Sequence, residues 1–279
     1  MSRRRFVAPL RGEVAPACFE HPLFEGCSWF GDWMRASQWP DIAAINARVQ
    51  LPGRSFIEQD QALLDDGLHY EARIAGRGQI ATRTGNWHDL FNAMVWGRYP
   101  GLKSALNARQ CLHIEAMGPN IRNRAQQALT QFDETGVIVR VRDRALLDLW
   151  DRHEWTVLFD THARRWHNGD IAVSAVIGHA LLEQALVPGR LLVGKCVVVV
   201  AEADDNNAVV AQVATAVANG GVLNDPAELR PLPLAGLPGW HAQQDAAFYA
   251  RHDYFRPLRE GRVYPAPLCA AAVDRGGSP

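Results

Sequence analysis

The longest nearly apolar stretch of the chain runs from Ile171 to Val187, and His179 and Glu183 are its main polar interruptions. Asp170 precedes the stretch as a suitable helix cap, and a proline follows it as a helix stop. This pattern predicts a single buried helix over residues 171–187. A helix that is apolar on nearly every side belongs in the interior of a protein.

Shorter segments with strand-like patterns predict two hairpins. Residues 69–74 and 79–83 flank a glycine-containing turn, and residues 130–141 repeat the arrangement with a turn from Asp133 to Gly136. The run from Leu191 to Val200 is apolar and rich in valine, which favours a buried strand. We therefore expect β-structure on both sides of the long helix.

Helix caps and stops are clearest in the middle of the chain. Asn86 is a suitable cap for a helix from Trp87 to about Arg98, and Pro100 ends that helix and begins the next. Asp89 would lie in the first turn, near the positive end of the helix dipole. Later helical patterns cover residues 143–155 and, after a cap at Asp204 or Asp205, residues 208–218.

Together these elements predict an α+β fold, with helices packed on short antiparallel hairpins and a small sheet. We expect residues 1–268 to form a single domain, with an irregular proline-rich C-terminal segment wrapped over its surface. Residues 269–279 are expected to be a disordered tail. The aromatic residues between Cys27 and Trp39 are expected to bury the N-terminal arm in the core rather than to bind a ligand.

The composition of the chain indicates which kinds of binding partner are not favoured. The chain has 279 residues, 48% of them hydrophobic, and its 29 Lys and Arg nearly cancel its 30 Asp and Glu. That balance gives no strong signal for nucleic acid or for an anionic membrane. The five cysteines form no CxxC pair, which favours a reducing cytoplasm, and no apolar run reaches the roughly twenty residues needed to span a membrane. We therefore expect a cytoplasmic protein.

Side chains that can perform chemistry recur at helical spacing in two places. His88 and Asn92 are four residues apart, so they share a helix face, and His179 and Glu183 repeat that spacing. Within a buried helix, the Glu183 carboxylate needs a cation, a metal or a hydrogen-bond donor to offset its burial. This requirement makes the second pair the more informative one.

Two answers to the burial of Glu183 remain open. In the first, His179 bonds Glu183 along the helix, and the pair is structural. In the second, both residues converge with His88, and with Asp133 or Glu134, on a divalent metal ion. The chain contains no HExxH, GxSxG, GxxxxGK[ST] or GxGxxG motif, which removes the common zinc peptidase, serine hydrolase and nucleotide-binding interpretations.

The predicted order of strand, turn, strand and helix across residues 69–98 also resembles, in outline, the ββα-metal nucleases. In that fold a histidine activates water beside one bound cation. The resemblance implies that His69 is the base and that either His88 or Asn92 is the helical residue of the site.

Three residues are candidates for substrate binding: Arg83, Trp87 and Lys103. Arg83 lies just before the helix that begins at Trp87, where an anionic group is favoured by the helix N-terminus. Pairing of Arg83 with Asp89 or Glu71 is the structural alternative.

Many short motifs appear together and in a fixed order along the chain. They are Thr82-Arg83, Trp87 to Ala93, Val95-Trp96, Pro100, Lys103, Asn107, Phe132 to Glu134 with Gly136, Gly178 to Glu183, Leu232 to Leu234, Gly236 to Trp240, Phe248-Tyr249 and Phe255 to Pro257. From about residue 65 to 258, they resemble a proteobacterial family known only as domain of unknown function 3025. The resemblance implies a cytoplasmic bacterial protein, and it implies no particular activity.

Two functional hypotheses follow. The first is an enzyme that uses a divalent metal, or water activated by histidine, to hydrolyse a small or anionic substrate such as a phosphodiester. Its candidate catalytic residues are His88, Asn92, His179 and Glu183. Its candidate metal ligands are His88, Asp133, Glu134, His179 and Glu183. The alternative is a non-catalytic binding or scaffold protein in which the His/Glu and His/Asn pairs are buried networks and added metal changes nothing.

Overall fold

A mixed β-sheet forms the centre of the protein. The computed structural model describes residues 6–118 and 121–269. The strands of the sheet are β3 (Gly136–Val141), β4 (Ile171–Val176), β5 (Val193–Val200), β6 (Arg230–Pro233) and β7 (Leu268–Cys269). β3 lies antiparallel to β4 and parallel to β5, and β5 also pairs with β6 and β7. Every residue of β3 is buried, as expected for a strand covered on both faces.

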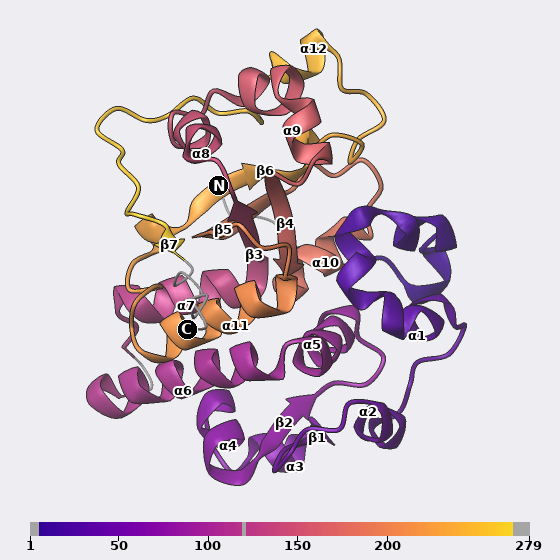
Figure 1. The fold of residues 1–279 in the computed structure, drawn as a ribbon. Helices are drawn as coiled ribbons and strands as arrows, with labels where there is room; N and C mark the ends of the chain where they lie inside the picture. Colours follow the sequence, from indigo (N-terminus) through magenta and orange to yellow (C-terminus); the bar gives the residue numbers. More distant parts are fainter. Residues whose placement is uncertain (1–5, 119–120, 270–279) are drawn as a thin grey trace, which may run out of the picture.

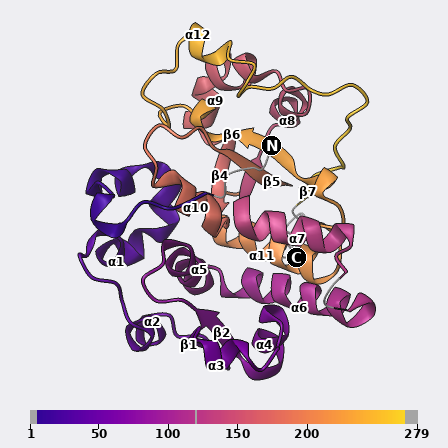
Figure 2. The ribbon, with the colours of Figure 1, turned by 180° about the vertical axis from the view of Figure 1, so that it is seen from behind.

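One group of helices lies against the sheet and extends to one side of it, as Figures 1 and 2 show. Its members are α5 (Trp87–Arg98), α6 (Pro100–Met117), α7 (Arg124–Thr135), α10 (His179–Ala185) and α11 (Asn206–Ala218). α7 and α11 contact the sheet directly, α11 also packs on α6, and α10 packs on both α5 and α7. This packing brings the first turns of α5 and α10 to the last turn of α7, and the candidate site lies there.

Two other groups of short elements complete the fold. The N-terminal group contains 3₁₀ turns at Arg11–Glu13, Pro16–Glu20 and Pro22–Phe30, followed by α1 (Gly31–Arg35), α2 (Ile42–Arg48), β1 (Ser55–Glu58), α3 (Gln61–Leu64), α4 (Tyr70–Arg77) and β2 (Gln79–Thr82). The second group contains α8 (Arg144–Asp151), a π-helical turn at Val157–Thr161, α9 (Ala163–His167), 3₁₀ turns at Pro226–Glu228 and Leu234–Gly236, and α12 (Ala246–Tyr249). Figure 1 shows α8, α9 and α12 on the opposite side of the sheet from α6.

Several sequence predictions are confirmed. Asn86 caps α5, and its Oδ1 atom accepts a hydrogen bond of 3.0 Å from the Asp89 amide. Pro100 begins α6, Asp205 caps α11, and the valine-rich run from 191 to 200 contains β5. In these segments the caps and the apolar content agree with the tertiary packing.

The predicted hairpin at residues 69–83 is wrong. Residues 70–77 form α4, which ends at Gly78 in the left-handed conformation, and β2 then pairs in parallel with β1. Gly78 also lies so close to Gly53 that a Cβ atom would be 2.2 Å from the Gly53 carbonyl oxygen. The strand partner of β2 therefore lies earlier in the chain, where local alternation cannot indicate it.

The predicted hairpin at 130–141 and the predicted helix at 171–187 are also wrong, because each segment contains one helical part and one strand. Residues 130–135 are the last turns of α7, and only β3 is a strand. Residues 171–176 form β4, and α10 begins at His179. A short apolar run rich in β-branched residues fits a buried strand as well as a buried helix, and here pairing with β3 decides for the strand.

The α+β architecture is confirmed, and one continuous cluster of buried hydrophobic residues joins the sheet, the helices and the N-terminal arm. Phe30 and Trp33 stack within it, whereas Trp29 is 62% exposed, so only part of the aromatic segment is core. Of the expected tail, Cys269 is the last residue of β7, while residues 270–279 lie outside the described residues. Among the described helices, none is long and apolar enough to cross a membrane.

Candidate functional site

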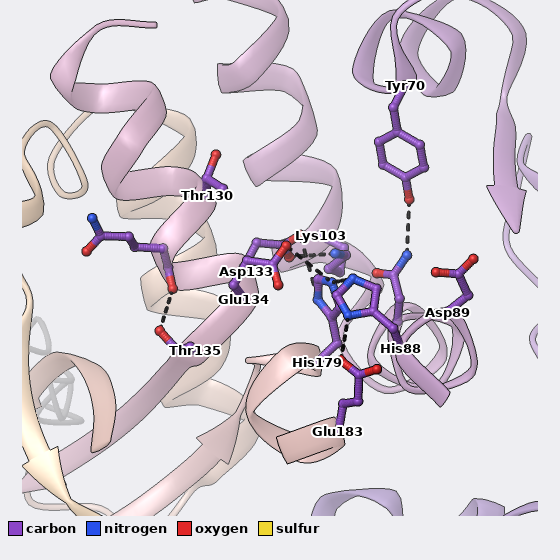
Figure 3. A network of polar contacts seen from close by, with 12 residues as sticks. Tyr70, His88, Asp89, Lys103, Thr130, Asp133, Glu134, Thr135, His179 and Glu183 are labelled. Atoms are coloured by element: carbon purple, nitrogen blue, oxygen red, sulfur yellow. Dashed lines mark hydrogen bonds and ion pairs between the residues drawn. The ribbon is translucent and has the colours of Figure 1, made fainter. Parts of the chain in front are cut away.

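Three helix ends meet at the candidate site. His88 lies in the first turn of α5, His179 is the first residue of α10, and Asp133 and Glu134 lie at the end of α7. Gly178 permits this meeting, because a Cβ atom there would be 2.5 Å from the Thr135 Cα atom. Figure 3 shows the two histidines between the α7 carboxylates and Glu183.

The two imidazoles face each other directly. The Nε2 atoms of His88 and His179 are 3.1 Å apart, and the ring planes are nearly perpendicular, with an interplanar angle of 73°. Two nitrogen ligands of one tetrahedral ion, each about 2.1 Å from it, would be separated by a similar distance. The two histidines thus share one site.

Glu183 finds its partner on another helix. The Nδ1–H of His88 donates to Glu183 Oε2 at 3.1 Å, whereas the predicted alternative was a bond from His179 along the helix. Because a carboxylate only accepts, this contact puts the proton of neutral His88 on Nδ1 and leaves the Nε2 lone pair free. Burial lowers the pKa of His88, but the bond to Glu183 and the charge of Glu134 outweigh it, so the pKa lies above its ordinary value.

His179 lies deeper in the protein than His88. It is 4% exposed, and burial lowers its pKa far below the ordinary value, so the ring is neutral at pH 7. Its Nε2 atom is 3.8 Å from Glu134 Oε1, and its Nδ1 atom is 3.9 Å from Asp133 Oδ2. Nδ1 has no hydrogen-bond partner among the described atoms. A neutral imidazole with one nitrogen aimed at a carboxylate is suited to metal ligation.

One set of donor atoms is close enough for metal binding within the described part of the chain. It comprises His88, Glu134 and His179, whose ligating atoms all lie within 4.8 Å of one another. Burial raises the pKa of Glu134 above its ordinary value, and a neighbouring cation would reverse that shift. Asp133 and Glu183 flank the set and face the ring nitrogens that point away from it.

Two of the predicted substrate-binding cations are already paired. Lys103 Nζ is 2.5 Å from Asp133 Oδ1, and its side chain is 5% exposed. The charge and the hydrogen bond of Lys103 hold the pKa of Asp133 below its ordinary value despite burial. Arg83 forms a bidentate pair with Asp89, with both distances 2.8 Å, which is the structural alternative raised above.

The sequence matches the model of one protein family. The model described as "Protein of unknown function (DUF3025)" matches residues 54–259, which include every residue of the site. The chain belongs to this family. No curated protein and no solved structure matches it. The DUF3025 match extends slightly beyond the residues expected from the motifs, and it assigns no reaction.

Of the other predicted site residues of this DUF3025 protein, Asn92 lies at the cavity and Trp87 does not. Asn92 lines the same cavity as His88, and its Nδ2 donates to the Tyr70 hydroxyl at 3.1 Å. Trp87 is 3% exposed and stacks on Phe91 within the N-terminal aromatic cluster.

His69 lines the cavity as the cap of α4, but α4 is a helix and β2 pairs in parallel with β1. The ββα-metal nuclease arrangement is therefore wrong for this chain, because that fold needs an antiparallel hairpin before its helix.

The cavity holds residues that sequence reasoning did not select. It has a volume of about 320 Å³ and is lined by Tyr70, Glu71, Asn107 and Gln110 in addition to the residues above. Asn107 and Gln110 follow Lys103 at four and seven positions along α6, so all three lie on one helix face. That polar stripe, on the same helix as the buried Leu102 and Leu106, was the available signal.

Proposed function

We propose that this DUF3025 protein is a hydrolase that uses a divalent metal ion bound by His88, Glu134 and His179. The observation that carries the proposal is the approach of the two Nε2 atoms to 3.1 Å beside a carboxylate, with the remaining nitrogen of His88 held by Glu183. A carboxylate behind a ligating imidazole is the usual arrangement of metal sites, because it fixes the tautomer of the ring.

The donor set favours a metal of the zinc, manganese or iron(II) class. Two imidazole nitrogens suit zinc and the later transition metals, and one carboxylate oxygen is compatible with all of them. Three protein ligands leave positions for water, and a bound divalent ion lowers the pKa of such a water toward neutrality. Asp133, which Lys103 keeps ionised, is the nearby acceptor for a proton.

The charges around the cavity favour a carbonyl substrate, such as an amide or an ester. Lys103 and Arg83 are each paired with an aspartate, so neither is free to neutralise a phosphate without breaking an ion pair. A phosphodiester would also approach the Glu71 carboxylate, which forms no ion pair among the described residues. We therefore propose hydrolysis of a carbonyl substrate and not of a phosphodiester.

A second candidate function is the non-catalytic scaffold. The Nε2 to Nε2 contact has the length of a hydrogen bond, so Glu183, His88 and His179 can form a closed network without an ion. In that state His179 Nε2–H donates to His88 Nε2, because the His88 proton is on Nδ1. The scaffold and the hydrolase therefore differ in whether a metal replaces this proton.

Metal binding is the deciding experiment. The chelated protein is titrated with Zn²⁺, Mn²⁺ and Mg²⁺ by calorimetry, and the metal content of the purified protein is measured by mass spectrometry. The proposal expects one ion per chain, a raised melting temperature, and loss of both in His88→Ala and His179→Ala. His167→Ala, on α9, is the control.

Hydrolase activity is then tested on the loaded protein with nitrophenyl esters, amino-acid anilides and bis-nitrophenyl phosphate. No stoichiometric ion under any condition would reject the metal site. A bound ion without hydrolysis of any of these bonds would leave a metal-binding scaffold in place of a hydrolase.

A further inference from the structure

The cavity continues away from the histidines between α4, α6 and α7. This part of the cavity, lined by Tyr70, Glu71, Asn107, Gln110 and Thr130, is called the polar arm below. Its only carboxylate is that of Glu71. Burial raises the pKa of this group above its ordinary value, and a bound cation would favour the ionised form. Glu71 forms no ion pair among the described residues, and its closest polar contact is the neutral amide of Asn107, at 2.6 Å from Oε2. Arg122 also lines the cavity, but its side chain is exposed.

The hydrogen bonds within the polar arm engage the side-chain NH2 groups of Asn107 and Gln110 and leave their side-chain oxygens unbonded among the described residues. Asn107 Nδ2 donates to the carbonyl and to the carboxylate of Glu71, and Gln110 Nε2 donates to the Gln126 carbonyl and to Thr130 Oγ1. Since carbonyl and carboxylate oxygens only accept, these contacts fix which end of each amide is nitrogen. The side-chain oxygens of Asn107 and Gln110 have no partner among the described residues, so they remain free to accept.

A separate observation at the start of the polar arm points the same way. Asn92 is 9% exposed, it lines the cavity, and its Oδ1 atom has no hydrogen-bond partner within the described residues. A buried polar atom without a partner costs free energy, which a bound ligand with a suitable donor would recover. The acceptor at Asn92 lies one helical turn from His88, so a ligand there would also reach the candidate metal site.

Apolar side chains line the cavity as well. Ile74, Leu106, Ile114 and Leu129 line the same cavity from α4, α6 and α7. Apolar walls suit methylene groups, whereas the oxygens of the polar arm suit a group with several N–H donors. Methylenes that end in an ammonium group combine both properties.

We propose that the polar arm binds the ammonium group of an aliphatic primary amine, with Glu71 as its charged acceptor. If the proposed hydrolase function holds, the substrate is then an amine-bearing amide or ester whose scissile bond lies at His88 and His179. An inorganic cation is the weaker occupant, because the polar arm contributes one carboxylate and the only close set of three metal-type ligands in the described chain is at the histidines.

Binding is tested without reference to catalysis. The probe is n-pentylammonium, and its neutral isostere is 1-pentanol. Both are titrated into the chelated protein and into the metal-loaded protein by calorimetry, with melting temperature as a second readout. Glu71→Gln keeps the shape and removes the charge, and Glu115→Gln on the exposed face of α6 is the matched control.

The ammonium is expected to bind at least about tenfold more tightly than the alcohol, because hydrogen bonds to a charged group are the stronger kind. Glu71→Gln should remove that preference, while Glu115→Gln should keep it. Equal binding of the two probes by the wild-type protein would overturn the proposal even if Glu71→Gln failed to fold. Displacement of the ammonium by Ca²⁺ or Mg²⁺ would assign the polar arm to an inorganic cation and would also overturn it.

The result separates this inference from the proposed function. Amine selectivity in the chelated protein together with failure of every metal titration would retain the amine site and reject the hydrolase. A functional metal site without amine selectivity would retain the hydrolase and reject the amine site.

Discussion

The Nε2 atoms of His88 and His179 lie 3.1 Å apart although the two residues are 91 positions apart in sequence. The contact joins the first turn of α5 to the first turn of α10, and Glu183 on α10 holds the opposite nitrogen of His88. Each helix therefore contributes one imidazole, and α10 also contributes the carboxylate that orients the imidazole of α5. The pair is built across an interface, so removing either ring affects both helices.

His88→Ala should destabilise the chelated protein more than His179→Ala. Glu183 bonds His88, so only the first substitution leaves a carboxylate that is 14% exposed without its donor, at a cost of about 2 kcal/mol. A bond between His179 and Glu183 along one helix, which was one of the two alternatives left open by the sequence, would instead give the larger loss to His179→Ala. Urea unfolding of both variants in chelator measures the difference. A larger loss in His179→Ala would contradict the observed pairing.

Glu183→Gln should weaken metal binding without abolishing it. The amide keeps the shape of the side chain but supplies a weaker acceptor for His88 Nδ1–H, and such outer partners typically contribute about 10- to 100-fold in affinity. Calorimetric titration with the ion that the wild-type protein prefers gives the ratio directly. Gln184→Glu, which adds a carboxylate one position away, is a control for local charge. An unchanged affinity in Glu183→Gln would show that Glu183 does not position the ligand.

Sequence reasoning selected residues that the fold brings together, but it did not predict all the helices and strands around them. It selected His88, His179, Glu183 and the Asp133-Glu134 pair from residue type, helical spacing and burial. It assigned the wrong structure to α4, to the last turns of α7 and to β4, because these short segments have patterns that fit helix and strand equally well. Pairing between distant strands decided their form, and a single sequence carries no record of that pairing.

The ion pairs of the site also differ in how far the sequence could predict them. The pairing of Arg83 with Asp89 was available from the sequence, since Arg83 lies just before the helix and Asp89 lies in its first turn. The pairing of Lys103 with Asp133 joins α6 to α7, and it required the packing of two helices. Local geometry is therefore predictable here, whereas contacts between elements are not.

Metal affinity should rise with pH through neutrality. His88 has a pKa above its ordinary value, and its proton must leave before the ring can bind an ion, so protons compete until the pH exceeds that pKa. His179 adds little to this competition, because burial keeps it neutral. Dissociation constants measured between pH 5.5 and about pH 8.5 test this, within the range where imidazoles titrate. Glu183→Gln should move the rise to lower pH, and an affinity independent of pH would refute the role of His88.

Lys103→Met should destabilise the protein by about 3 kcal/mol, because it leaves the Asp133 carboxylate in a largely buried position without its cation. Replacing both partners, as in Lys103→Met with Asp133→Leu, should recover much of that loss, since no unpaired charge remains. Lys195→Met provides a control, because Lys195 forms no ion pair among the described residues and is only partly buried. Chemical unfolding at pH 7 compares the four proteins. Equal losses in the single and double variants would show that the charge of Asp133 is not the cause.

Asp66→Asn should remove an acid-sensitive part of the stability of α4, the helix that presents Tyr70 and Glu71 to the cavity. The hydrogen bond from Arg73 lowers the pKa of Asp66 to about 2, with further contributions from the Leu68 amide and Arg77. Because the folded pKa lies below the unfolded value of about 4, the unfolded chain binds more protons between these values. The stabilisation is therefore complete above pH 4 and is lost as the pH falls toward 2. Unfolding free energies of wild-type and Asp66→Asn should differ by a constant amount above pH 4 and converge in acid. A difference that persists at pH 2 would show that the stabilisation by Asp66 does not depend on its charge.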